Sequence, residues 1–99
     1  MSAQNGKIAS GIEMLLDLSD YPKSTIILFL WLIRLGDEQM NVYATEKKLM
    51  RCTGIKSRNT LYEALTTLKT KNYVVRNKKA WTITGITNQC YTCLKIMFE

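Results

Sequence analysis

The sequence predicts a small α+β fold that is mostly helical. Apolar residues recur at helical spacing in five segments, at about residues 6–18, 22–35, 46–52, 58–71 and 86–97. Between the last two helices, residues 73–75 and 80–84 are rich in β-branched and aromatic residues and flank a four-residue polar turn at 76–79, which is the pattern of a β-hairpin. A further short strand is expected at residues 40–43, just before the third helix.

The two N-terminal helices differ in polarity. The first keeps acidic side chains for an outer face, whereas residues 26–33 of the second are apolar nearly all round. Ser19 or Asp20 can cap this second helix, Pro22 is tolerated in its first turn, and Gly36 ends it. Because a helix without a polar face is buried on several sides, the covering surface can include a second subunit.

The third and fourth helices are delimited by local signals. Thr45 is a natural N-cap for the third helix, and Gly54 is its expected C-cap. Ser57 then caps the longer fourth helix. The apolar stripe of the fourth helix consists of Leu61, Ala64, Leu65 and Leu68.

The remaining elements are placed by alternation and helical spacing. In the second hairpin strand, Trp81 and Ile83 alternate with threonines, so we expect Trp81 in the core rather than on a base-stacking surface. We expect the same of Trp31. In the short strand, Met40 and Val42 share one face. The inward residues of the last helix are predicted to be Ile86, Cys90, Cys93, Leu94 and Met97.

Length and composition favour one domain over residues 1–99. The chain is 46% hydrophobic, which is ample for one core. Its longest apolar run, Ile26–Ile33, is about half of the roughly 20 residues that a membrane span needs. The N-terminus begins with polar residues and does not resemble a signal peptide. We therefore expect a cytoplasmic protein that does not insert into a membrane.

The three cysteines permit two interpretations. Their odd number suits a reducing compartment better than a disulfide scaffold. Cys90 and Cys93 have the spacing of a redox pair or of half a zinc site, but the chain has no histidine and only Cys52 besides them. We expect Cys90 and Cys93 to be buried core thiols, and we predict no metal site and no cofactor.

Positive charge is concentrated in residues 44–79. This segment carries +8, because ten basic residues face only Glu46 and Glu63, whereas residues 1–43 carry −2 and residues 80–99 are neutral. The basic residues are Lys47, Lys48, Arg51, Lys56, Arg58, Lys69, Lys71, Arg76, Lys78 and Lys79. A phosphate-lined partner favours such an arrangement, which predicts binding of double-stranded DNA.

A longer motif points to a known superfamily. It runs Thr45-x3-Leu49, then Gly54-Ile55-Lys56-Ser57-Arg58-Asn59-Thr60-Leu61, then Ala64-Leu65-x2-Leu68 and Tyr73-Val74. Over about residues 22–84 the chain resembles winged helix-turn-helix DNA-binding domains. The resemblance implies a recognition helix at 58–71 and a hairpin wing, with terminal helices 6–18 and 86–97 for dimerisation as in small dimeric repressors or plasmid and phage segregation adaptors.

The predicted DNA contacts follow from the chemistry of base edges and phosphates. Arg bonds guanine, Asn bonds adenine, Glu accepts from cytosine, and Lys suits phosphates. Ser57 with the helix N-terminus can hold a phosphate. The predicted contacts are Lys47, Lys48, Lys56, Ser57, Arg58, Asn59, Tyr62, Glu63, Thr66, Arg76, Asn77, Lys78 and Lys79. The alternative for each is a solvated polar surface.

The sequence is compatible with more than one function. The sequence does not indicate a catalytic site, because it has no histidine, no G-x-S-x-G nucleophile motif and no P-loop. We therefore predict no catalytic residue. The same fold could instead bind another protein, for example in a segregation or transcription complex. Among DNA-binding roles, a transcriptional repressor is the default, and segregation or replication control also fits. We expect a homodimer.

Overall fold

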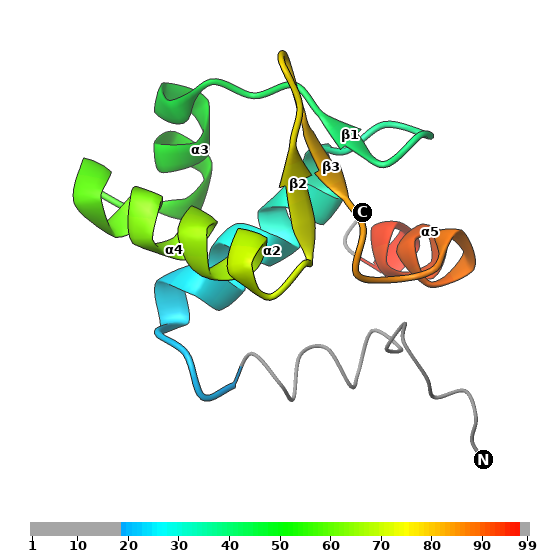
Figure 1. Ribbon diagram of the computed structural model, residues 1–99, viewed down its shortest axis with the longest axis horizontal. Helices are drawn as coiled ribbons and strands as arrows, with labels where there is room; N and C mark the ends of the chain where they lie inside the picture. The colour runs from blue at the N-terminus through cyan, green and yellow to red at the C-terminus, as the bar shows by residue number, and fades with distance from the viewer. Residues whose placement is uncertain (1–18, 98–99) are drawn as a thin grey trace.

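The computed structural model describes residues 19–97, which form four helices and a three-stranded antiparallel sheet (Figure 1). In chain order the elements are α2 (Lys23–Leu35), β1 (Asn41–Val42), α3 (Glu46–Thr53), α4 (Arg58–Thr70), β2 (Val74–Arg76), β3 (Trp81–Ile83) and α5 (Asn88–Met97). This is a small, mostly helical α+β fold, as the sequence predicts. The helix predicted at residues 6–18 lies outside the described residues.

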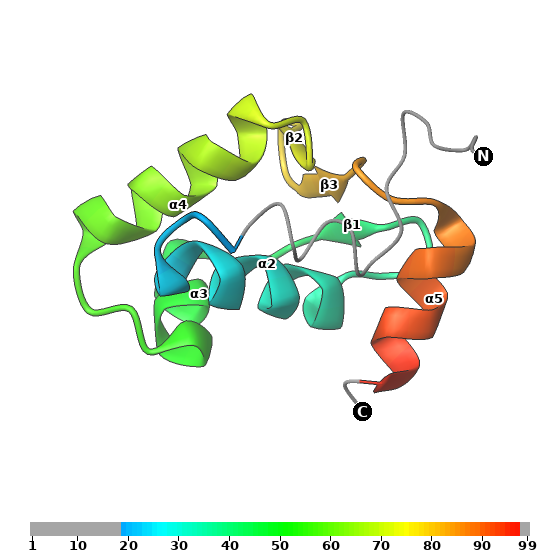
Figure 2. The same ribbon diagram turned by 90° about the horizontal axis from the view of Figure 1, so that it is seen from below.

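Helix α2 lies at the centre of the described fold and packs against α3, α4, α5 and β1 (Figure 2). One stripe of α2 is buried, comprising Thr25, Leu28, Phe29, Leu32 and Ile33. Ile27, Leu30 and Trp31 on its other side are half-buried. The predicted N-cap of α2, Ser19 or Asp20, is wrong, because Pro22 occupies the N-cap position without a side-chain cap. The Pro22 carbonyl accepts from the Thr25 N–H at 2.9 Å.

The predicted caps of α3 and α4 are confirmed. The Thr45 hydroxyl accepts from the Lys48 N–H at 3.1 Å, and the Ser57 hydroxyl accepts from the Thr60 N–H at 3.4 Å. Gly54 ends α3 with φ 78°, a left-handed conformation that favours glycine. All four residues of the predicted α4 stripe are buried. These signals therefore set where the two helices begin and where α3 ends.

The end of α4 leads directly into the sheet. Asn72 adopts φ 64°, and the Tyr73 N–H bonds the Leu68 carbonyl at 2.9 Å, which completes a Schellman-type cap. The sheet order is β1–β3–β2. Arg76 pairs with Trp81 and so belongs to β2 rather than to the turn, which consists of residues 77–80.

Helix α5 is attached to the end of α2 through Tyr91. The Tyr91 hydroxyl donates to the Asp37 carbonyl at 2.9 Å, and the side chain is only 2% exposed. Gly36 has extended backbone, but a Cβ there would collide with the Tyr91 hydroxyl. Lys95 adds bonds from its ammonium group to the carbonyls of Arg34 and Gly36. The ring of Tyr91 thus fills the space that Gly36 leaves.

The inward face of α5 differs from the prediction. Its buried residues are Tyr91 and Leu94, whereas Cys93 is exposed and Met97 is 74% exposed. The cause is the Tyr91 anchor, which rotates the helix so that Cys93 and Met97 face outward. The three cysteines are free thiols, with Cys52 and Cys90 half-buried, so the expectation of buried thiols is wrong for Cys93.

No group of three or more His, Cys, Asp or Glu side chains within residues 19–97 could hold a metal ion. None of the helices in this part of the chain has the length and apolar character required to cross a bilayer.

Replacing Tyr91 with Phe should lower the free energy of unfolding by about 0.5–1.5 kcal/mol at neutral pH, because the hydrogen bond from the Tyr91 hydroxyl is lost while the Asp37 carbonyl keeps the one from the Met40 N–H. Urea titration measures this loss.

Burial, with the Asp37 charge second, raises the pKa of Tyr91 from 10.0 to about 12. The stabilisation is therefore complete below pH 10 and is lost as pH rises to about 12. The variant should lose less stability over that range than the wild type. Tyr43→Phe, at a 66% exposed position, is the control.

Candidate nucleic-acid interface

The outer face of α4 is open, as predicted. Arg58, Asn59, Glu63 and Thr66 are exposed, and Tyr62 is 43% exposed. The opposite stripe packs in the core, so these side chains lie on the solvent-facing side of the helix. Ser57 caps the start of this face, as predicted, because its hydroxyl accepts the Thr60 N–H.

The positive charge of residues 44–79 lies on the surface. Every one of the ten basic side chains in this segment is exposed. They come from α3, the turn that follows it, α4 and the hairpin, which are consecutive elements of the chain. The segment is therefore a basic surface, as its sequence predicts.

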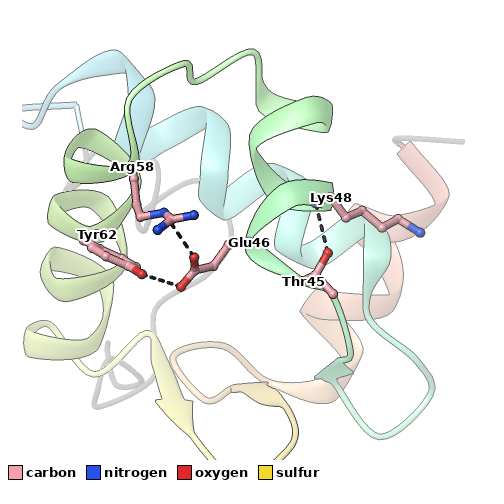
Figure 3. A network of polar contacts seen from close by, with 5 residues as sticks. All are labelled: Thr45, Glu46, Lys48, Arg58 and Tyr62. Atoms are coloured by element: carbon pink, nitrogen blue, oxygen red, sulfur yellow. Dashed lines mark hydrogen bonds and ion pairs between the residues drawn. The ribbon is translucent and has the colours of Figure 1, made fainter.

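Glu46, the first residue of α3, joins two predicted contact residues of α4 (Figure 3). Its Oε1 lies 3.5 Å from the Arg58 Nε, and its Oε2 accepts from the Tyr62 hydroxyl at 2.5 Å. The Arg58 side chain stays 66% exposed and that of Glu46 is 44% exposed. The hydrogen bond to Glu46 is the main cause that raises the pKa of Tyr62 above 10.0. The three side chains form a network that we call the Glu46 cluster.

The Glu46 cluster borders a groove between α4 and the hairpin. This hairpin-side groove has a volume of about 310 Å³. Its polar and aromatic walls are formed by Thr45, Glu46, Tyr62, Thr66, Lys69, Arg76 and Trp81. The Arg76 guanidinium lies 5.1 Å from the centre of the Trp81 ring, which is a cation–π contact. Trp81 therefore packs on the core, as predicted, and also forms part of the groove.

A second groove follows the other flank of α4. It has a volume of about 680 Å³ and lies between α4 and the start of α2, where Pro22, Ser24 and Thr25 form its wall. Asn59 and Glu63 line this α2-side groove, while Tyr62 and Thr66 border both grooves. Tyr62 and Thr66 thus mark the crest of α4.

The hairpin is fastened across the sheet by side chains. The Asn77 amide donates to the Thr82 hydroxyl at 2.5 Å, and that hydroxyl donates to the Asn41 amide oxygen at 2.6 Å. Asn77, predicted as a DNA contact, is therefore occupied in holding the three strands together. Lys78 and Lys79 are exposed and have no hydrogen-bond or ion-pair partner among residues 19–97.

The predicted contacts do not all converge. Arg58 and Tyr62 meet at Glu46, and Arg76 lines the hairpin-side groove together with Tyr62 and Thr66. Lys48 extends from the side of α3 that faces away from the Glu46 cluster (Figure 3). Lys47, on α3, and Lys56, in the turn before α4, are exposed and line neither groove.

Sequence reasoning missed two residues of this surface, Glu46 and Lys69. Lys69 follows Tyr62 by seven residues and Thr66 by three, so helical spacing could have placed it on the crest. Glu46 gives no such signal, because its contacts to α4 depend on how the two helices pack.

Comparison of the chain with protein-family models, with curated proteins and with solved structures gives no match. Its function is therefore inferred from its own residues and their geometry.

Glu46→Ala should lower the pKa of Tyr62 toward 10.0, because the hydrogen bond and the nearby negative charge both favour the protonated phenol. NMR titration with ring-labelled tyrosine, assigned with a Tyr62→Phe variant, measures this change. Glu63→Ala removes a carboxylate from the same helix face and is the matched control. An unchanged Tyr62 pKa in Glu46→Ala would contradict the observed hydrogen bond.

Proposed function

We propose that this chain binds double-stranded DNA in a sequence-specific manner as a dimeric winged helix-turn-helix protein. Helix α4 is the recognition helix, and the hairpin β2–β3 is the wing. The observation that carries the proposal is the exposure of all ten basic residues of 44–79 around one helix with an open polar face. Such a surface attracts phosphates and releases their counterions.

The geometry of α4 suits the major groove. That groove is about 12 Å wide and admits one α-helix, provided that the helix exposes a polar face. The crest of Tyr62 and Thr66 would enter it, with Arg58 and Asn59 near the N-terminal end of the helix. Arg58 would bond guanine and Asn59 adenine, and a good bidentate pair contributes about 1–3 kcal/mol of discrimination. Glu63 would accept from cytosine.

The wing would bind the DNA backbone. Lys78 and Lys79 are exposed at its tip and unpaired within the described part of the chain, so no intramolecular contact must break when they meet phosphates. Lys69 and Arg76 on the hairpin-side groove extend the basic surface from the wing to the crest of α4. Phosphate contacts of this kind fix the register without specifying sequence.

The biological role that we propose is transcriptional repression. Selection of bound DNA from a random or genomic library separates this role from its alternatives. Isolated sites beside promoters support a repressor, whereas iterated arrays would indicate segregation or replication control. Failure to enrich any sequence, together with weak salt dependence, would favour a protein-binding module instead.

A homodimer is also part of the proposal. Ile96 and Met97 near the end of α5 are 65% and 74% exposed, and α2 carries half-buried apolar residues on its outer side. Apolar surface of this kind favours association. Light scattering at micromolar concentration should give about twice the 11.4 kDa chain mass. Ile96→Asp with Met97→Asp should shift the protein toward the monomer. A wild-type mass of one chain would contradict the dimer.

Replacing Lys78 and Lys79 together with Gln should weaken binding to all duplexes about equally. Each lysine lost from a phosphate should reduce the slope of log affinity against log salt by about one unit, so the pair should reduce it by about two. Fluorescence anisotropy over a salt series measures this slope. Arg34→Gln removes a positive charge outside the basic segment and should change the slope much less than either lysine does. Unchanged affinity and slope in the hairpin variant would exclude the wing from the interface.

A further inference from the structure

Glu46 is one of only two acidic side chains among the ten basic ones of residues 44–79. Its carboxylate uses one oxygen for Arg58 and the other for Tyr62, both of them on α4. A negative charge at this place repels the phosphates of every duplex, whatever its sequence. Glu46 therefore lowers the affinity for DNA of any sequence. Any favourable effect of Glu46 on DNA binding must act through Arg58 and Tyr62, the two side chains that it contacts.

The contact with Glu46 leaves the terminal Nη groups of Arg58 available for hydrogen bonds to a base. The ion pair is given by the contact of Glu46 with the Nε atom, which is nearest to the helix, and no hydrogen bond among residues 19–97 engages the two terminal Nη groups. Figure 3 shows the guanidinium beside the Glu46 carboxylate, with Tyr62 on the same side of α4. The two Nη groups are the fork that can bind guanine end-on with two hydrogen bonds.

Tyr62 makes the carboxylate a fixed support. Its hydroxyl bond to Oε2, at 2.5 Å, is shorter than the 3.5 Å separation between Oε1 and Arg58 Nε. Tyr62 has only two side-chain rotations before its hydroxyl, so it orders Glu46 at little entropic cost. Arg58 is then held beside a carboxylate whose own position is set.

We propose that Glu46 is a positioning residue for sequence readout, which orients the Arg58 fork toward guanine and disfavours duplexes that lack this base. This inference rests on the proposed DNA-binding function and adds a specificity-determining residue to it. An arginine that is ordered before binding loses less conformational freedom on the preferred site. On duplexes without this guanine, the Glu46 carboxylate still repels the phosphates, and no Arg58–guanine contact offsets that repulsion.

The test compares affinities for the preferred duplex, found by library selection, and for a random duplex of equal length. Glu46→Gln should raise affinity for the random duplex and reduce the preference ratio about two- to tenfold, which corresponds to the loss of one ordered side chain. Tyr62→Phe keeps every charge and removes the bond that fixes Glu46, so it should reduce the ratio in the same direction. Circular dichroism checks that each variant is folded.

A double-mutant cycle with Arg58→Ala separates positioning from charge. If Glu46 acts through Arg58, Glu46→Gln should no longer change the preference ratio in the Arg58→Ala background, although it should still raise affinity for the random duplex. Glu38→Gln, a loss of the same charge outside the basic segment, is the matched control.

Three outcomes would overturn the inference. The first is an unchanged ratio in Glu46→Gln, and the second is a change of ratio that persists without Arg58. The third is a higher ratio in Glu46→Gln, which would mean that the carboxylate blocks Arg58 rather than presenting it. In all three the wild type still binds DNA with a preference, and only the role of Glu46 fails. A wild type without preference for any duplex would remove the proposed function and this inference together.

Discussion

The packing of other elements on one face of α2 is the constraint on which the described fold depends. Phe29, Leu32 and their neighbours on this stripe are buried, and α3, α4, α5 and β1 all contact the helix. Leu61, Leu65 and Leu68 of α4 join the same core. The inward side of α4 is thereby committed to packing, and its polar side must face outward. The basic surface is in this sense a consequence of the core.

Local signals in the sequence predict much of this fold. Thr45, Gly54 and Ser57 act through hydrogen bonds to near neighbours or through their own backbone angles, so their effects can be anticipated without knowing the tertiary structure. The hairpin boundary is different. Arg76 belongs to β2 because it pairs with Trp81, and the register between two strands is a non-local property.

The last helix shows a second limit of sequence patterns. Spacing alone placed Cys93 and Met97 inward, but the rotation of α5 is set by Tyr91, whose hydroxyl reaches the Asp37 carbonyl from 54 residues away. The candidate site likewise has features that the sequence predicts and a contact that depends on tertiary packing. Exposure of its basic residues follows from their chemistry, whereas the contact of Glu46 with Arg58 and Tyr62 requires two helices to meet at one angle. No spacing rule encodes that angle.

The contact between Gly36 and Tyr91 also limits how this fold can vary in evolution. The backbone of Gly36 is extended, with φ −69°, so its torsion angles would permit any residue, and only the neighbouring ring excludes a side chain. Positions 36 and 91 should therefore change together in chains that share this fold. A larger residue at 36 requires a smaller one at 91, and the smaller residue releases the tether of α5. Covariation between these two positions would record which lineages keep the last helix attached at this point.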